Sequence, residues 1–476
     1  MKRVLILAAA MLMAQTALWA APFTQGNLVV YRVGDGTSPL TNQGNYAYLD
    51  ELTTNGTLVQ SITLTQNQFV DGNSVTQFPI INSGAATSEG LITLSTDGRY
   101  VVFSGYAAGT NWSPGVAANL TTAAGAFVPR VVGRAGADGS IDTSTAGIFA
   151  TGSGGNPRGV ASTDGSNFWI TSSTEGVGYT TLGSTAPFSV LQANNNRGIA
   201  IYDSRADISY PGNVQIYFTS STRMTSFGTN LPTTITFNTN LVGISSTVTP
   251  FHSPYGFVAL PLQAGGTNID TIYLADEGSN VSKWCYSPVS ASWSNFGSID
   301  TSAPPNGIGN PCGIRSVTAS VSVSGSQTNV HLYFLSGCGV SGGGTVYAIT
   351  DSTGYNGMLS GTWPAPIANT ATIFAAHPLV VWRGIAFAPA NTLRITAATK
   401  TGSDVPIVWN AVGGNSYVVQ ASPGDGHGGY TTNNFVDISP TNFVASLGYS
   451  QTNYVDVGGA TNRPSRYYRV RQVSQP

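Results

Sequence analysis

Short runs in which apolar residues alternate with small or polar ones recur along most of the chain, separated by Gly, Asn, Asp and Ser. Such alternation over roughly four to eight residues predicts β-strands, and the residues between the runs favour tight turns. Stretches of strong helix formers are almost absent after the first 20 residues. The pattern therefore predicts an all-β protein.

Six of the predicted strands share a short motif, in which one larger residue precedes a small residue and an apolar run. They begin at Glu89, Arg158, Arg197, Tyr255, Arg315 and Arg383. The first five are followed by a second, more apolar strand. The order of inner strand, turn, second strand and one or two weaker strands is typical of a propeller blade, so the repeats predict a β-propeller.

The repeat at Arg383 has no second strand behind it, whereas the N-terminal part offers unassigned strands at residues 27–33, 46–52 and 58–64. We expect these strands to complete the blade that the last inner strand begins, which closes the ring and removes exposed sheet edges. The predicted fold is a six-bladed β-propeller over residues 21–389. A different blade count stays open, because residues 235–249 could hold another hairpin.

From about Phe23 to Pro389 this repeat style resembles the broad group of six-bladed propellers that includes NHL-type and gluconolactonase-like proteins. The resemblance implies the fold. It specifies function only weakly, because one fold hosts many activities.

The repeat motif is no longer found over residues 390–476. Strand-like runs in this region begin at Leu393, Val405, Ser416, Phe435, Asn453 and Arg466. Such runs between turn residues predict a small β-sandwich. The ending from Tyr467 to Arg471 and an expected core residue, Trp409, resemble a fibronectin type III or immunoglobulin-like module. The resemblance implies a spacer or adhesive unit of a bacterial secreted protein and no catalysis.

The first residues have the layout of a secretory signal peptide over residues 1–20. Lys2 and Arg3 precede an apolar run, and small residues surround the expected cleavage site after Ala20. We expect secretion to the periplasm, the cell surface or the exterior. No later segment has the roughly 20 consecutive apolar residues of a membrane helix, so no membrane span is expected.

Charged residues make up 8% of the chain and the formal net charge is −2. This charge balance argues against nucleic acid as a ligand, because phosphate backbones are bound by clustered Lys and Arg.

The chain has three cysteines, Cys285, Cys312 and Cys338. Disulfides persist outside the cytosol, and Cys312 and Cys338 flank one hairpin of the fifth blade at the same end. We predict a Cys312–Cys338 disulfide and a buried free thiol at Cys285.

The residues that open the inner strands are the main candidate site. Glu89, Arg158, Arg197, Tyr255, Arg315 and Arg383 would lie at one height around the central channel, and four of the six are arginine. Guanidinium groups that converge there could bind a carboxylate, sulfate or phosphate, with Glu89 as an internal counter-charge. The alternative is structural: each arginine donates to carbonyl groups of adjacent blades and holds the ring together.

A gluconolactonase-like metal site is the sharpest enzymatic alternative, because Glu89-Gly90 is similar to the Glu-Gly pair with which those enzymes bind a divalent metal. Later repeats depart from the family pattern, with arginine at Arg158 and Arg197 where the family has asparagine. The positive charges of these arginines would repel a metal ion. No metal or other cofactor is therefore expected.

Other catalytic signatures are missing from the sequence. The histidines His252, His331, His377 and His427 lack metal-ligand spacing, and no nucleophile elbow, phosphate loop or dinucleotide fingerprint is found. Trp112, Trp284, Trp293 and Trp363 could stack on sugar rings, although packing between blades is the more common use of such residues.

Three hypotheses follow. The first is a secreted, non-enzymatic binding or scaffold protein whose arginine-lined mouth takes an anionic small molecule or a polysaccharide. The second is a lactonase, lyase or hydrolase acting at the same mouth. The third is a cell-surface adhesive protein, which an exposed aromatic patch on the sandwich would favour.

Overall fold

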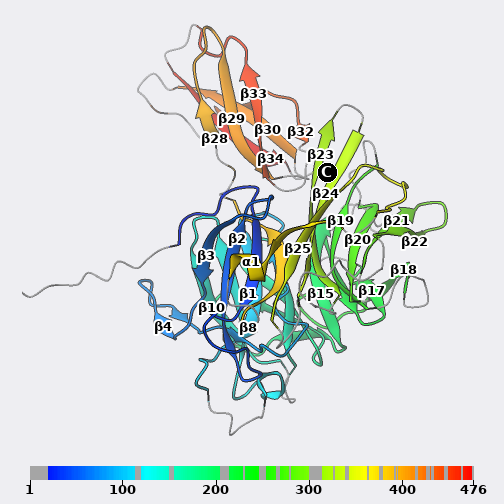
Figure 1. Cartoon of the computed structure of the whole chain (residues 1–476). Coiled ribbons are helices and arrows are strands. Elements are labelled where there is room, and N and C mark those ends of the chain that lie inside the picture. The colour runs from blue at the N-terminus through cyan, green and yellow to red at the C-terminus, as the bar shows by residue number, and fades with distance from the viewer. Residues whose placement is uncertain are drawn as a thin grey trace, which may run out of the picture.

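The computed structural model describes most of the chain (Figure 1). The described residues are 20–112, 119–149, 155–203, 214–228, 231–245, 253–263, 269–277, 280–299, 313–324, 327–337, 342–361, 364–374, 379–390, 393, 395–412, 416–424, 429, 434–443, 449–461 and 465–473. The predicted signal peptide, apart from Ala20, lies outside them, as do Cys312, Cys338 and Trp363.

Four antiparallel sheets of four consecutive strands form the middle of the chain. The first contains β11 (Pro157–Ser162), β12 (Asn167–Ser172), β13 (Val177–Thr181) and β14 (Ser189–Gln192). The second contains β15 (Asn196–Asp203), β16 (Val214–Ser220), β17 (Arg223–Ser226) and β18 (Thr239–Ser245). The third contains β19 (Pro254–Leu260), β20 (Thr271–Asp276), β21 (Asn280–Ser287) and β22 (Ser292–Ser298). The fourth contains β23 (Ile314–Ser324), β24 (Gln327–Ser336), β25 (Thr345–Asp351) and β26 (Pro366–Asn369).

A nine-stranded sheet joins the two ends of the repeat region. One half comprises β1 (Leu28–Val33), β2 (Asn45–Leu52), β3 (Leu58–Thr63) and β27 (Val381–Phe387). The other half comprises β7 (Thr93–Leu94), β8 (Tyr100–Tyr106), β9 (Arg130–Gly136) and β10 (Ile141–Gly147), and β6 (Ile81–Asn82) links the halves. β1 pairs antiparallel with β27, with Leu28 opposite Phe387. The N-terminal strands thus lie beside the last strand of the repeat region, as the sequence pattern predicts.

The beginnings of successive sheets approach one another closely, and the glycine of the repeat motif makes this possible. A Cβ on Gly198 would lie 2.2 Å from the carbonyl oxygen of Tyr255 in the next sheet, and one on Gly384 would lie 2.3 Å from the carbonyl oxygen of Gly90. The backbone N–H of Leu91 in turn donates to the carbonyl oxygen of Arg158 (3.0 Å). The repeat motif therefore encodes tight packing between the first strands of neighbouring sheets.

Apolar residues fill the spaces between neighbouring sheets. One buried cluster joins β1, β2 and β8 and includes Val29, Leu49 and Phe103. Another includes Leu274 and Trp284 of the third sheet and Tyr217 of the second. Trp284 and Trp293, considered from the sequence as possible sugar-stacking residues, are buried in this cluster and serve packing instead.

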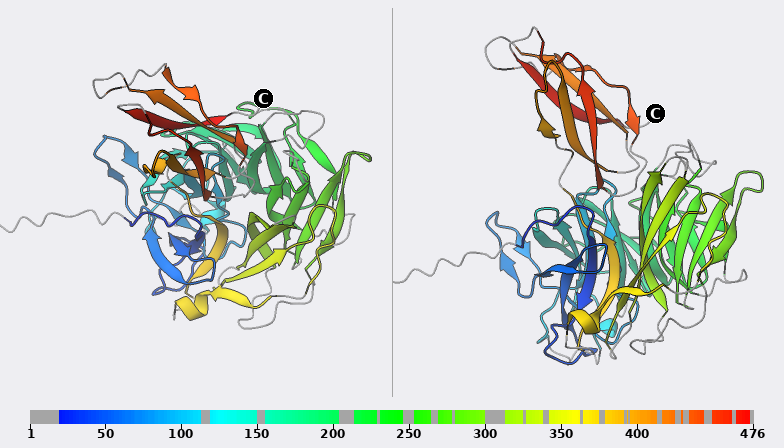
Figure 2. Two further views of the ribbon diagram at one scale, coloured as in Figure 1. Left: turned by 90° about the horizontal axis from the view of Figure 1, so that it is seen from above. Right: turned by 45° about the horizontal axis from the view of Figure 1, so that its top comes forward.

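The C-terminal residues form two further sheets that lie apart from the repeat region (Figures 1 and 2). One contains β28 (Ile395–Ala398), β29 (Val405–Val412) and β33 (Tyr449–Asp456). The other contains β30 (Ser416–Pro423), β31 (Val436–Asp437), β32 (Asn442–Phe443) and β34 (Arg466–Val473). They share a core around Trp409 and Tyr417, so the core position predicted for Trp409 is confirmed.

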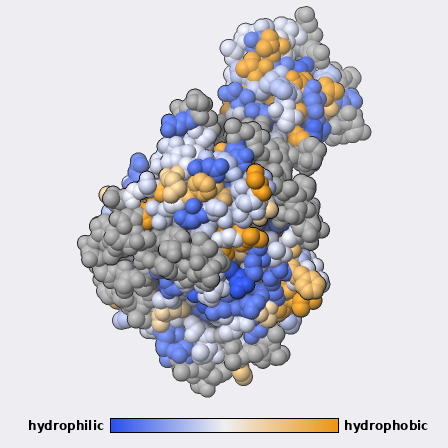
Figure 3. Space-filling model, turned by 90° about the vertical axis from the view of Figure 1, so that its right-hand side faces the viewer, coloured by the Kyte–Doolittle hydropathy of each residue, from blue (hydrophilic) through white to orange (hydrophobic). Residues whose placement is uncertain are grey.

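The remaining elements are short. They are the hairpin of β4 (Phe69–Val70) and β5 (Thr76–Gln77), the 3-10 turn η2 (Leu120–Thr122) and the single-turn helix α1 (Thr370–Ile373). None of the described helices is long and apolar enough to cross a membrane. In the face shown in Figure 3, apolar residues form small separate patches among hydrophilic ones.

The structure corrects two details of the predicted strands. The first inner strand, expected to start at Glu89, is reduced to the two residues of β7, because Gly90 adopts a φ of 80° and packs against Arg383 and Tyr31. Residues 239–245 are β18, which pairs with β17 as the last strand of its sheet. They do not form an additional hairpin of their own.

Candidate functional site

The residues predicted from the repeat motif converge where the first strands of the sheets begin. We call Arg158, Arg197, Arg315 and Arg383, together with Tyr255 and Glu89, the arginine cluster. Each member lies at, or just before, the start of a first strand. The glycine that follows Arg158 and Arg197 allows the neighbouring sheet to come close, so these two side chains reach across to the next repeat.

Tyr255 lies between two guanidinium groups. The Cζ atoms of Arg197 and Arg315 are 4.2 Å and 4.5 Å from the centre of its ring. The same two arginines share the carboxylate of Glu277: Arg197 Nη1 is 3.7 Å from Oε2, and Arg315 Nη2 donates to Oε1. Cation–π contact and a shared counter-charge hold this half of the cluster together.

Arg383 and Glu89 form the other half. Glu89 is buried and accepts hydrogen bonds from Tyr106 Oη (2.7 Å) and the backbone N–H of Ser83 (2.9 Å). Arg383 is also buried, and its Nη2 donates to the carbonyl oxygens of Ser83 (3.1 Å) and Gly84 (3.3 Å). The segment after β6 thus supplies groups to both members of this pair.

Carbonyl groups also accept hydrogen bonds from some of the N–H groups of Arg158 and Arg315. Arg158 Nη1 donates to the carbonyl oxygen of Asn196 (3.0 Å) and to the side chain of Asn195. Arg315 Nη1 donates to the carbonyl oxygen of Thr87. These bonds are the ones that the structural interpretation of the arginines predicts.

Burial shifts the acid–base equilibria of the cluster. It lowers the pKa of Arg383 to about 10, against the attraction of Glu89. Burial likewise lowers the pKa of Arg158 to about 10, and the positive charges of Arg197 and Arg315 act in the same direction. Burial also raises the pKa of Glu89, because the charged carboxylate loses water; Arg383 and the hydrogen bonds to the carboxylate oppose this shift.

Positive charge is concentrated at this end of the first strands. The cluster contains four arginines; among the described contacts, Glu277 pairs with Arg197 and Arg315, and the charge of Glu89 acts on Arg383. Among the described residues, Nε of Arg158, Arg197 and Arg383 and Nη1 of Arg383 are buried without a hydrogen-bond partner. Unpartnered N–H groups of this kind are costly, and an anion or water would satisfy them.

The donor set does not fit a divalent metal. Both carboxylate oxygens of Glu89 already accept hydrogen bonds, and its charged neighbour is Arg383. Within the described part of the chain, no three His, Cys, Asp or Glu side chains gather as a ligand set. Ca²⁺ takes six to eight oxygen ligands, which the surroundings of Glu89 do not offer.

Sequence reasoning brought the six motif residues together but missed their partners. Glu277 directly follows β20 and is not among the predicted site residues. Its position at the end of a second strand, beside the start of the next repeat, was the available signal. Asn82 and Tyr106, which contact Glu89, carry no signal in the sequence because β6 and β8 meet the cluster only through the fold.

Among the cysteines, Cys285 is buried and unpaired in β21, the third strand of its sheet, as predicted. Burial raises the pKa of its thiol. The predicted Cys312–Cys338 disulfide falls on residues outside the described part of the chain.

Comparisons with known proteins assign no family to this chain. No family and no curated protein matches it. Among solved structures, a periplasmic gluconolactonase of Pseudomonas aeruginosa is similar over 89% of this chain and 99% of its own, with 11% identity and a TM-score of 0.32. YCF48 bound to D1 peptide covers 83% of this chain and 96% of its own at 10% identity and a TM-score of 0.30. The structure of a glucose dehydrogenase covers 66% of this chain and 95% of its own, at 10% identity and a TM-score of 0.33. These values are too low to carry an activity over.

Proposed function

We propose that this protein is a secreted, non-enzymatic binding protein that holds a small anion at the arginine cluster. The observation that carries the proposal is that buried guanidinium N–H groups of Arg158, Arg197 and Arg383 have no hydrogen-bond partner among the described residues. Planar guanidinium groups bind carboxylate, sulfate or phosphate through paired hydrogen bonds. A sugar acid or another carboxylate on a small molecule fits this chemistry.

The same proposal includes a six-bladed propeller as the frame. The pairing of β1 with β27 supports it, as do the contacts that run from each first strand to the next. In this frame the arginine cluster surrounds one end of the central axis. The C-terminal sheets would then be a fibronectin type III or immunoglobulin-like spacer or attachment module, which their two-sheet packing supports.

Secretion after removal of residues 1–20 belongs to the proposal as well. Packing of the chain immediately after the expected cleavage site supports it: the carbonyl oxygen of Ala21 accepts a hydrogen bond from Gln60 (3.0 Å), and Phe23 donates its N–H to Ala137 (2.9 Å). Intact-mass measurement of protein recovered from the periplasm or medium should give a chain that starts at Ala21.

Thermal unfolding of the mature chain at constant ionic strength tests anion binding. Gluconate, galacturonate, citrate, phosphate and sulfate would each be titrated against chloride. Specific binding stabilises the folded state in a saturable way, by about 2.7 kcal/mol at a hundredfold excess over Kd. General salt effects of sulfate and phosphate keep rising with concentration instead. We expect at least one anion to raise the midpoint saturably.

Variants locate the effect. Arg158→Lys keeps the positive charge but loses the planar guanidinium group. We expect it to weaken the affinity for the stabilising anion at least tenfold. Arg223→Lys, at an exposed position in β17, is the matched control and should bind as the parent does. If no anion acts saturably, the arginines serve only to hold the sheets together.

The two alternatives have their own signatures. Metal-dependent hydrolysis of glucono-lactone that is lost in Glu89→Gln would support a lactonase instead. An adhesive role would draw on the C-terminal sheets, where the large hydrophobic residues exposed among the described positions are Val436, Val455 and Val457. Valine offers no aromatic surface, so this feature does not favour the adhesive alternative.

A further inference from the structure

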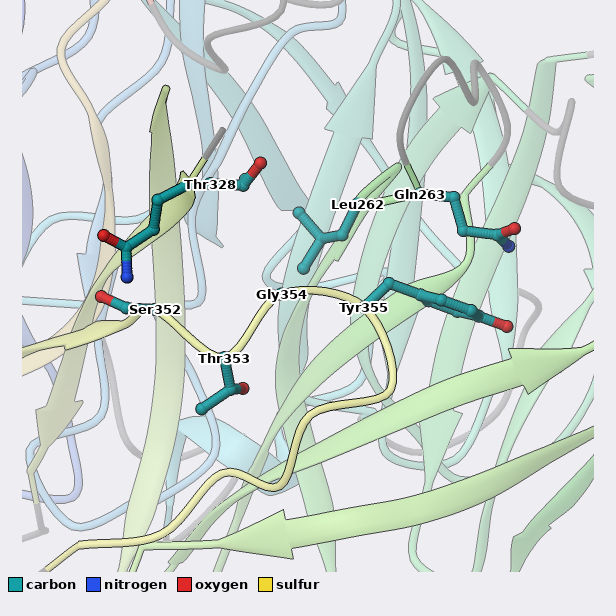
Figure 4. Close-up of a pocket in the computed structure, with 8 residues that line it drawn as sticks. Leu262, Gln263, Thr328, Ser352, Thr353, Gly354 and Tyr355 are labelled. Atoms are coloured by element: carbon teal, nitrogen blue, oxygen red, sulfur yellow. The ribbon is translucent and has the colours of Figure 1, made fainter. Parts of the chain in front are cut away.

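A polar groove lies at the opposite ends of the first strands from the arginine cluster. Its volume is about 680 Å³, and residues 262–263, 327–328 and 352–355 line it (Figure 4). Tyr255 is at the start of β19, whereas Leu262 and Gln263 follow its end. The groove is therefore a separate feature, formed between the third and fourth sheets.

One wall is fixed by a buried carboxylate. Asp270 accepts hydrogen bonds from the backbone N–H groups of Leu262 and Gln263, each at 2.9 Å. Asp270 is buried, and the loss of water raises its pKa despite these bonds. The wall is held in place at the cost of burying a carboxylate.

The opposite wall is fixed by a buried ion pair. Lys283 Nζ donates to Asp351 Oδ2 (2.8 Å), Thr353 Oγ1 (2.9 Å) and the carbonyl oxygen of Gly354 (2.6 Å). Lys283 is fully buried, so all three of its donors point into the protein and none reaches the groove. The pair orients residues 353–354 without giving the groove a charge.

Tyr355 supplies an aromatic surface in a fixed orientation. Its hydroxyl donates to the carbonyl oxygen of Tyr286, and its ring is partly exposed. In Figure 4 the ring lies beside Gln263, with Ser352 and Thr353 on the segment that leads to it. Anchoring the hydroxyl leaves the ring, rather than the polar tip, to meet a ligand.

The other groups on the walls are amides and hydroxyls. The side-chain amides of Gln263 and Gln327 make no hydrogen bond within the described part of the chain, and Ser352 Oγ donates to Asn329 (2.6 Å). No lining residue carries a charge. Amides pair with hydroxyl groups as both donor and acceptor, and an aromatic ring packs against the C–H face of a sugar.

We propose that this groove binds a neutral oligosaccharide, with a sugar ring on Tyr355 and its hydroxyl groups on Gln263 and Gln327. An anionic ligand would have no cation to pair with among the residues that line the groove, because the ammonium group of Lys283 donates all its hydrogen bonds inside the protein. An apolar ligand would leave the amides unpaired. Two buried carboxylates that hold the two walls in place give the preformed geometry that weak sugar contacts need.

Isothermal titration of the mature chain with neutral hexasaccharides tests the proposal. The probes are cellohexaose, xylohexaose, laminarihexaose, mannohexaose and chitohexaose, with hexagalacturonate as a charged comparator. We expect at least one neutral probe to bind. Tyr355→Ala should weaken it about tenfold, because the substitution removes the ring on which the sugar stacks. Tyr355→Phe keeps the ring and should stay within about threefold.

Further variants separate binding from folding and from the arginine cluster. Gln263→Ala with Gln327→Ala should weaken the same probe, whereas Gln68→Ala, an exposed glutamine on another part of the chain, should not. Each variant must keep the thermal midpoint of the repeat region within about two degrees of the parent's. Arg158→Lys should leave neutral-sugar binding unchanged. Absence of binding to every neutral probe, or equal binding by Tyr355→Ala, would overturn the proposal.

Discussion

At the residue scale, the residue before each glycine of the repeat motif and the glycine itself have complementary roles. Arg197 donates to the carbonyl oxygen of Pro254 (3.4 Å) at the start of the next sheet, and Gly198 leaves room for that strand to approach. Arg158 reaches Asn196 in the same way. The arginine can bridge two sheets only because the small residue beside it lets their backbones come together.

The first prediction concerns this close approach. Gly198→Ala places a Cβ 2.2 Å from the carbonyl oxygen of Tyr255 and forces two backbone segments apart. We expect a loss of about 1–3 kcal/mol in the free energy of unfolding, as in overpacked cores. Gly72→Ala is the control, because a Cβ there has no neighbour within 4 Å. Denaturant unfolding of both variants measures the difference, and equal stabilities would contradict the packing argument.

The second prediction concerns the pH dependence that Glu89 imposes. The pKa of this carboxyl is raised in the folded protein, so the folded state binds its proton more tightly than the unfolded chain does. Its contribution to stability is therefore greatest at low pH and falls as the pH rises from the unfolded pKa, near 4.5, through the folded value. Glu89→Gln removes this titration.

The measurement is the free energy of unfolding of parent and Glu89→Gln between pH 4 and pH 7. The stability of the parent minus that of the variant should decrease as the pH rises. A difference that stays constant would show that Arg383 and the hydrogen bonds cancel the effect of burial on Glu89, and one that increases with pH would show that they outweigh it.

At the scale of elements, the junction of the two chain ends depends on one carboxylate. Asp50 of β2 accepts hydrogen bonds from Arg32 of β1 (2.9 Å), Ser61 of β3 (2.7 Å) and the indole N–H of Trp382 in β27 (2.9 Å). All four strands of this half-sheet therefore meet at one side chain, which is fully buried.

The third prediction is that Asp50→Ala strongly weakens this junction. It leaves the buried Arg32 without its counter-charge, a change that typically costs about 3–5 kcal/mol. Asp71→Ala is the control, since among the described residues the side chain of Asp71 bonds only within the β4–β5 hairpin. Chemical denaturation followed by tryptophan fluorescence should show a much larger loss for Asp50→Ala, and comparable losses in the two variants would refute the role of Asp50.

Strand positions could be predicted from the sequence because alternation and turn residues are local signals. The predicted strands at 27–33, 46–52 and 58–64 differ from β1, β2 and β3 by at most one residue at each end. The partners of the cluster could not be predicted in the same way. Glu277 meets Arg197 and Arg315 only after two sheets have packed, and the groove draws its walls from three separate segments.

At the scale of the whole molecule, the chain has separate cores before and after residue 390. Trp382 is fully buried in the core between β27 and the fourth sheet, and Trp409 in the core between the two C-terminal sheets. The described clusters that contain these residues share no member. Units with independent cores can unfold independently.

The last prediction follows from these two cores. Calorimetry of the mature chain should resolve two unfolding transitions. Trp409→Ala should lower only the midpoint of the C-terminal unit and Trp382→Ala only that of the repeat region, because each removes a large buried side chain worth about 3–5 kcal/mol. A single transition that both variants shift equally would mean that the C-terminal sheets unfold together with the repeat region, and their role as a separable spacer would then fail.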